Sequence, residues 1–149
     1  MQNPESKLCH GNFPDPKEVR KTVLGLLYRG QASHLGTNMS AVEILISIYG
    51  SVDIQRIQLK ENNRSRVLVS KGHCAATTYA TLAHYGLLSF EELNGYHKNG
   101  SLLAGHVSHA VEGVEHSTGA LGHGLSVAVG CAVGLRSRGI NDAPVFALV

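Results

Sequence analysis

Apolar residues recur at helical spacing near the start of the chain. The segment between Asp15-Pro16 and Gly30 carries them on one face, at Val19, Val23, Leu26 and Leu27. Aspartate is favoured just before a helix, proline at its first position and glycine just after its end. The pattern therefore predicts an amphipathic helix between these boundaries.

Three further segments show the helical period. Residues 41–49 have apolar side chains on one face, with Asn38 or Ser40 as the expected cap. Residues 75–85 and 121–138 follow the same period, and the second of these is rich in small residues. We therefore expect at least four helices.

Short branched apolar runs predict strands. Residues 67–69 and 145–149 have the character of buried parallel strands, and helices alternate with them. This order predicts an α/β fold with a parallel sheet flanked by helices. Because two strands do not make a stable sheet, we expect the rest of it to come from further sequence or from another chain.

Residues 100–117 follow neither period. A stretch of that length without regular structure is uncommon inside a domain unless it forms a binding loop.

The composition is that of a globular protein. The chain has 149 residues, of which 43% are hydrophobic and 16% charged, which fits one domain. We expect residues 1–16, which are polar and contain prolines, to form a flexible leader, and residues 17–149 to form the domain.

Charge and hydropathy limit the partners. The formal net charge of +2, without a cluster of Lys and Arg, argues against a nucleic acid partner. No apolar run reaches the ~18 to 20 residues that span a bilayer, so no membrane segment is expected. The N-terminus lacks the apolar region of a signal peptide, and we expect a cytoplasmic location.

The chain has three cysteines, Cys9, Cys74 and Cys131. Their odd number and wide spacing argue against a disulfide framework and against a cysteine-based zinc site. We expect Cys74 and Cys131 to be small buried residues.

A glycine-rich turn at residues 117–124, Ser-Thr-Gly-Ala-Leu-Gly-His-Gly, leads into the last predicted helix. Glycines let a backbone approach a ligand closely, and the first turn of a helix offers free N–H groups and the positive end of its dipole to an anion. The arrangement suits a phosphate group. Taken alone, it also fits a helix entry selected for tight packing.

Three histidines stand beside glycines at the ends of predicted elements. His34 lies in Ser-His-Leu-Gly, His73 ends Ser-Lys-Gly-His after the first strand, and His106 follows Gly105 in the long loop. Ligands of open α/β sheets bind outside the carboxyl ends of the strands, which favours His73 as a site residue. Taken singly, each histidine is more often an ordinary surface or core residue.

In this order and spacing, the four segments resemble the amino-terminal half of transketolase, and more narrowly the separately encoded N-terminal subunit of split bacterial and archaeal transketolases. The family pattern runs Ser-Gly-His-Pro-Gly, Ser-Asn/Lys-Gly-His, Gly-His-Pro and Thr-Gly-Pro/Ser-Leu-Gly-Gln-Gly. It is met here at residues 33–36, 70–73, 105–106 and 118–124. The resemblance implies a thiamine diphosphate-binding fold.

The chain also departs from this pattern. No glycine precedes His34, Leu35 and Val107 replace prolines, and His123 stands where glutamine is usual. The family places Gly-Asp-Gly and an asparagine, which hold the Mg²⁺ that bridges protein and diphosphate, at positions that would lie beyond Val149. The resemblance thus implies that this chain holds an incomplete binding domain without the metal ligands.

The resemblance also implies residue roles in the transfer of a two-carbon ketol unit between sugar phosphates, a reaction of the pentose phosphate pathway. His73 would contact the diphosphate region of thiamine diphosphate. The turn would line the cofactor through three residues, Gly119, Ala120 and Leu121, the last as apolar support beneath it. His34 and His106 would face the substrate, hydrogen-bond the hydroxyls of the donor ketose and move protons, which imidazole does readily near neutral pH.

In transketolases the carboxylate that protonates the cofactor's pyrimidine belongs to a second domain, and active sites form between subunits. The resemblance therefore implies a C-terminal partner subunit or domain, a homodimer or a dimer of heterodimers, and an isolated chain that is inactive. Glu43 lies on the polar side of a predicted helix, so we expect it to be solvated and not to be that carboxylate.

Three alternatives remain open at this point. A zinc or nickel site could form in the long loop from His106, His109, His116, Glu112 and Glu115. A truncated cofactor domain could act as a non-catalytic interaction module, which the missing Gly-Asp-Gly favours and the three retained histidines oppose. The His-Leu-Gly-Thr-Asn segment also resembles deoxyxylulose-phosphate synthase, which uses the same cofactor, although the other signatures of that enzyme do not follow.

Overall fold

The computed structural model describes residues 13–149. Of the predicted leader, residues 1–12 lie outside this range, and residue 16 already belongs to the first helix. The elements follow the chain in this order: α1 (Pro16–Arg29), α2 (Leu35–Met39), α3 (Val42–Gly50), α4 (Ile54–Gln58), β1 (Arg66–Val69), the 3₁₀ helix η1 (Gly72–Cys74), α5 (Ala75–His84), the 3₁₀ helix η2 (Glu92–Gly95), α6 (His123–Ser137) and β2 (Val145–Leu148).

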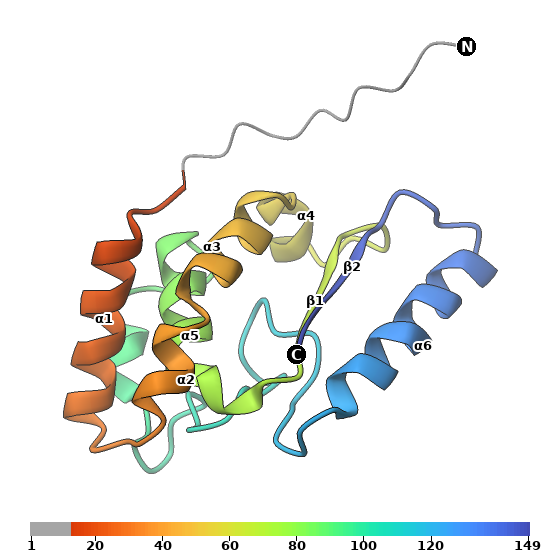
Figure 1. The fold of residues 1–149 in the computed structure, drawn as a ribbon. Helices are drawn as coiled ribbons and strands as arrows, with labels where there is room; N and C mark the ends of the chain where they lie inside the picture. Colours follow the sequence, from red (N-terminus) through yellow and green to blue (C-terminus); the bar gives the residue numbers. More distant parts are fainter. Residues whose placement is uncertain (1–12) are drawn as a thin grey trace.

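The predicted α/β architecture is confirmed. Strands β1 and β2 pair in parallel, with Arg66 opposite Val145 and Val69 opposite Leu148, and they form the sheet found within the described residues. Helix α6 packs on one side of the strands, while α1, α3 and α5 lie on the other (Figure 1). The segment between η2 and α6 has no regular helix or strand, as its sequence predicted.

Helix α1 begins as its sequence predicts. The side chain of Asp15 accepts a hydrogen bond from the backbone N–H of Lys17, and Pro16 occupies the first helical position. The four apolar residues of the predicted stripe are all buried: Val19, Val23, Leu26 and Leu27.

The core lies between the sheet and helices α1, α3 and α5. Helix α5 is central to it, because every side chain from position 75 to 83 is buried. Val23, Leu45, Val67 and Tyr79 meet there and are almost wholly removed from solvent. Each aliphatic or aromatic side chain buried in this way stabilises the fold by roughly 1.5–3 kcal/mol.

Asn38 is a polar residue within this core, with a side chain 1% exposed. Its Oδ1 accepts a hydrogen bond from the backbone N–H of Thr77 at 2.9 Å. Its Nδ2 donates to the carbonyls of His34 at 2.9 Å and of His73 at 3.3 Å. The expectation that Asn38 or Ser40 caps α3 is wrong: Ala41 is the N-cap, and it makes no side-chain cap bond.

Helix α6 buries only one edge against the strands, through Gly124, Ala128 and Leu135. On its other side Leu125, Val129 and Val133 are 49%, 58% and 63% exposed. We call these three residues the α6 apolar face. At spacings of four residues, the three side chains form one row of apolar surface along the helix.

The two predicted buried cysteines differ. Cys74 is buried, and burial raises the pKa of its thiol to about 11, so the thiol stays protonated at neutral pH. Cys131 lies on α6 and is only partly buried, so the prediction is wrong for this residue. The reason is that much of α6 projects away from the core.

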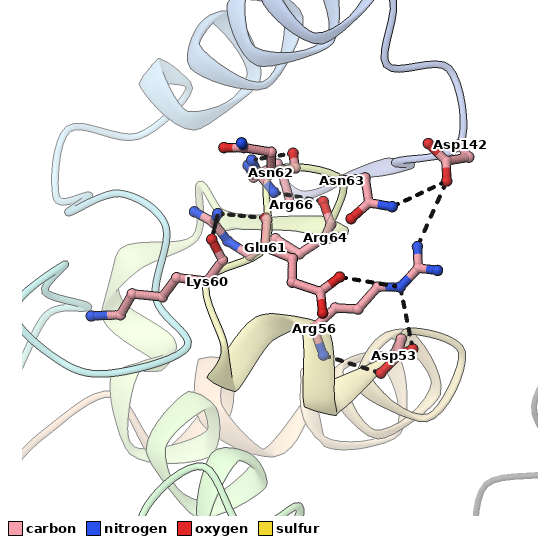
Figure 2. Close-up of polar contacts among 9 residues, drawn as sticks. All are labelled: Asp53, Arg56, Lys60, Glu61, Asn62, Asn63, Arg64, Arg66 and Asp142. Atoms are coloured by element: carbon pink, nitrogen blue, oxygen red, sulfur yellow. Dashed lines mark hydrogen bonds and ion pairs between the residues drawn. The ribbon is translucent and has the colours of Figure 1, made fainter.

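The loop that enters β1 is held by an arginine network (Figure 2). Arg56 forms ion pairs with Asp53 at 3.5 Å, Glu61 at 3.7 Å and Asp142 at 3.7 Å. Exposed pairs of this kind contribute only about 0–1 kcal/mol each. Because Asp142 precedes β2, the network's main effect is to hold the entries of both strands together.

Within residues 13–149, no helix combines the length and the apolar character that a bilayer crossing requires.

Replacing Asn38 by Ala should destabilise the protein by about 2–4 kcal/mol, because buried partners of its side chain lose their hydrogen bonds. Urea unfolding followed by circular dichroism measures the change. The matched control is Ser40→Ala, at an exposed position next to the same helix, where we expect a change within about 0.5 kcal/mol. Equal stability of the two variants would contradict the role given to Asn38.

Two glycines of α6 should respond in opposite ways to alanine. A Cβ at Gly124 would lie 2.7 Å from the Cα of Ser70, so Gly124→Ala should destabilise by about 1–3 kcal/mol. Gly130 faces open space, so Gly130→Ala should stabilise the helix by about 0.5–1 kcal/mol. Thermal unfolding of both variants tests this, and a shift of the same sign in both would refute the close approach at Ser70.

Candidate functional site

The predicted site residues gather at the carboxyl end of the sheet. Strand β1 ends at Val69, and the backbone N–H groups of Ser70 and Lys71 both donate to the carbonyl of Leu148 in β2. The chain then turns through η1, which carries His73. This is the edge at which parallel α/β sheets bind ligands.

Three histidines from distant segments meet there. The ring centroids of His34 and His73 are 5.3 Å apart, and those of His34 and His106 are 5.8 Å apart, both pairs edge to face. His34 lies between the other two. It precedes α2 with a φ of 69°, a left-handed conformation that is uncommon for residues other than glycine.

Close backbone packing joins the motif segments. A Cβ at Gly72 would lie 2.6 Å from the carbonyl oxygen of Thr118, so only glycine fits at this position. The N–H of Val107 donates to the carbonyl of Gly72 at 3.1 Å, and the N–H of Thr118 donates to the carbonyl of Val107 at 3.2 Å. The hydroxyl of Thr118 also donates to the carbonyl of Val69. Residues 70–73, 105–107 and 117–118 are thereby fixed against each other.

Two pockets open beside the histidines. One has a volume of about 180 Å³ and is lined by Gln31, Ala32, Ser33, His34, Tyr96, His97, Gly105 and His106. The other has a volume of about 270 Å³ and is lined by Ser70, Lys71, His73, Leu121, Gly122 and Val149. We call them the His34 pocket and the His73 pocket.

The predicted site residues divide between these pockets. His34 and His106 line the first, and His73 and Leu121 line the second. Gly119 and Ala120 line neither pocket and are exposed in the turn before α6. Gly119 lies near His106, since a Cβ built on it would be 3.8 Å from the Cδ2 of that ring. The roles given to these six residues stay predictions.

The electrostatics of the His73 pocket suit an anion. Burial lowers the pKa of His73, and the positive potential of His34, Lys71 and His106 lowers it further. The same positive potential attracts an anion. The Nζ of Lys71 donates to the hydroxyl of Ser40 at 2.8 Å, which places the ammonium group at the same edge. The first turn of α6 adds the positive end of its dipole. Neither of the two pocket linings, within the described residues, contains a carboxylate.

The carboxylates considered in the sequence have other partners. Glu115 receives two hydrogen bonds from Arg64, at 2.8 and 3.0 Å, and so is not free to bind a metal. His109 is hydrogen-bonded through Nδ1 to the hydroxyl of Ser117 at 2.6 Å. Residues 13–149 contain no group of three or more His, Cys, Asp or Glu placed to hold a metal ion. The structure therefore gives no support to the histidine metal site.

Glu43 is exposed, as predicted, and pairs with Arg20 at 2.5 Å, which lowers the pKa of its carboxyl group.

Sequence reasoning missed three residues of the site. Asn38 holds the backbones of His34 and His73, and the hydroxyl of Tyr79 donates to the carbonyl of His106 at 3.0 Å. His97 lines the His34 pocket. Both Asn38 and Tyr79 lie within helices, where no periodic pattern marks a polar contact. For His97 the available signal was its place in the segment Tyr-His-Lys-Asn-Gly, directly before the predicted loop of residues 100–117.

The family model for the transketolase thiamine diphosphate-binding domain matches residues 17–143. The chain is also similar to proteins named as transketolase subunits. The chain is 40% identical over 120 residues to an apulose-4-phosphate transketolase subunit of Phocaeicola vulgatus, covering 78% of this chain and 42% of that protein. It is 30% identical over 124 residues to a 6-deoxy-6-sulfo-D-fructose transketolase subunit of a Clostridium species, covering 79% and 44%. The chain thus spans less than half the length of these relatives.

Solved structures show the same fold. A transketolase from Leishmania mexicana matches with a TM-score of 0.67 and 27% identity, over 91% of this chain and 22% of that one. A transketolase from Pichia stipitis matches with a TM-score of 0.71 over 89% of this chain and 21% of that one, at 21% identity, which speaks for the fold alone. The predicted resemblance is confirmed by these matches together with the order of the motifs around the three histidines. The chain belongs to the transketolase family, within its thiamine diphosphate-binding domain.

Proposed function

We propose that this chain is the N-terminal part of a transketolase that moves a two-carbon ketol unit from a ketose phosphate to an aldose phosphate. The observation that carries the proposal is the meeting of His34, His73 and His106 at the carboxyl end of the parallel strands. Relatives named as subunits of apulose-4-phosphate and 6-deoxy-6-sulfo-D-fructose transketolases support a split enzyme with a separate C-terminal partner.

The residues present fit thiamine diphosphate. The exposed residues 119–121 lead into α6, and the positive end of this helix's dipole points to the same region, which suits a diphosphate. Lys71 and His73 add a cation and an imidazole at the same edge. Leu121 is 69% exposed beside them and offers an apolar surface for a ring. Mg²⁺ would balance the charge of the diphosphate, and residues 13–149 contain no group of three or more His, Cys, Asp or Glu that would hold it.

Thiamine diphosphate, when bound, supplies a carbon that attacks the ketose carbonyl and stabilises the resulting negative charge. The chain's own residues bind and orient the substrate. His34 and His106 present imidazole nitrogens in the His34 pocket, where they hydrogen-bond sugar hydroxyls and exchange protons with them. Tyr79 and Asn38 hold the backbones of these two histidines, so the rings stay in place during proton exchange.

The α6 apolar face supports the need for a partner. Its three exposed side chains lie on the helix that follows the glycine-rich turn of residues 117–124. A protein segment that packs on this face would therefore lie close to the site. We propose that a pyrimidine-binding domain or subunit completes the enzyme, as a homodimer or a dimer of heterodimers. The isolated chain is then inactive.

Calorimetric titration tests the proposal. We expect thiamine diphosphate with Mg²⁺ to bind to a mixture of this chain and a C-terminal transketolase subunit. The variant His73→Ala should weaken this binding by about 10- to 100-fold, as loss of a hydrogen bond to a charged group does. His116→Ala, at an exposed histidine outside both pockets, is the matched control and should bind as the unaltered chain does.

Absence of binding in the mixture would refute the catalytic proposal and leave an interaction module as the function of the domain.

The protonation of His73 gives an independent prediction. NMR titration should place its midpoint below the ordinary value of about 6.5, because burial and neighbouring positive groups disfavour the imidazolium ion. The folded chain then binds fewer protons than the unfolded chain, so His73 costs stability as the pH falls below about 6.5 towards its lowered pKa. His34→Asn removes one neighbouring charge and should raise the midpoint. A midpoint above 6.5 in the unaltered chain would contradict this environment.

A further inference from the structure

A fourth histidine, His97, lines the His34 pocket together with His34 and His106. It lies outside the four motif segments, just after the 3₁₀ helix η2. Its ring is 5.9 Å from that of the buried Tyr96, measured between centroids. The pocket therefore holds one imidazole more than the motifs account for.

Backbone strain is concentrated around this pocket. Gln31, His34 and His97 have φ values of 46°, 69° and 59°, and all three line it. Within residues 13–149 the other non-glycine residue with a positive φ is Lys60, which belongs to a different region. Such conformations are costly, and they persist at ligand sites, where the surrounding structure fixes a side chain in a required position.

One ring nitrogen of His97 has a fixed role. Nδ1 lies 3.0 Å from the carbonyl oxygen of Gly30. Because a carbonyl only accepts hydrogen bonds, Nδ1 must carry the proton and donate. In the neutral ring Nε2 is then an acceptor. No residue among positions 13–149 forms a hydrogen bond with this Nε2 within the structure.

Two glycines make room for the ring. A Cβ at Gly105 would lie 3.0 Å from the Cδ2 and 3.2 Å from the Nε2 of His97. A Cβ at Gly30 would lie 3.1 Å from the Cβ of His97. The ring thus sits between the segment that leads to His34 and the segment that carries His106. Its Nε2 edge faces Gly105, at the wall of the pocket.

We propose that Nε2 of His97 accepts a hydrogen bond from a hydroxyl group of the sugar substrate, and that His97 is a specificity-determining residue. The inference rests on the proposed function, which supplies the polyhydroxylated ligand. A neutral acceptor fixed in this way favours a hydroxyl group over a phosphate oxygen, which has no proton to donate. An analogue that lacks the hydroxyl group forgoes this hydrogen bond and therefore binds less tightly than the hydroxylated sugar.

Two substitutions separate binding from positioning. His97→Asn keeps a donor amide near the position of Nδ1, tolerates the positive φ and removes Nε2. His97→Gln places an acceptor oxygen near the position of Nε2 and gives up the bond to Gly30. In the assembled enzyme, with fructose 6-phosphate as donor, His97→Asn should raise KM by about 3- to 10-fold with little change in kcat, and His97→Gln should raise it less.

The reverse order, with His97→Asn like the unaltered enzyme and His97→Gln impaired, would show that His97 only holds the loop, and would overturn the inference. That result leaves the proposed function intact. An unaltered assembly without transketolase activity would instead refute the proposed function.

NMR of the same assembly, labelled with ¹⁵N-histidine, tests the hydrogen bond to Nε2 of His97 independently of catalytic activity. We expect the Nδ1–H tautomer and a shift of the Nε2 resonance when fructose 6-phosphate is added. An unchanged Nε2 resonance at saturating sugar phosphate would overturn the inference.

Discussion

The site depends on the close packing of the turn before α6 against the end of β1. Gly72 meets the carbonyl of Thr118, and Gly124 meets the backbone of Ser70, at distances that leave no room for a methyl group. The hydrogen bond from Gly124 N–H to the Ser70 hydroxyl, at 3.1 Å, adds direction to this contact. Because the two segments touch, His73 and the turn before α6 are held at one edge of the sheet.

The histidines are positioned from inside the core more than from the surface. Asn38 accepts from the central helix α5 and donates to the carbonyls of His34 and His73, so one buried amide sets the relation between two pocket residues. A buried amide is costly unless its donors and acceptors are paired, and here they are. Because Asn38 bonds to the backbone carbonyls of His34 and His73, the imidazole rings of both residues remain available to a ligand.

Much of this could be predicted from the sequence. The periods of α1, α3, α5 and α6 and the two short apolar strands are local signals, and they predicted the α/β class. Helix α4 was missed because five residues are too few to show a period. The cap of α3 was wrongly predicted because Asn38 bonds to Thr77, which lies 39 positions further along the chain. The contact between His97 and Gly30 spans 67 positions, and no local pattern encodes it.

The α6 apolar face has a consequence for the life of the protein in a cell. Leu125, Val129 and Val133 form a row along one helix, and side chains of this kind are recognised by chaperones and proteases when they remain in water. A copy of the domain in which this row stays in water is therefore a target for these systems and prone to aggregate.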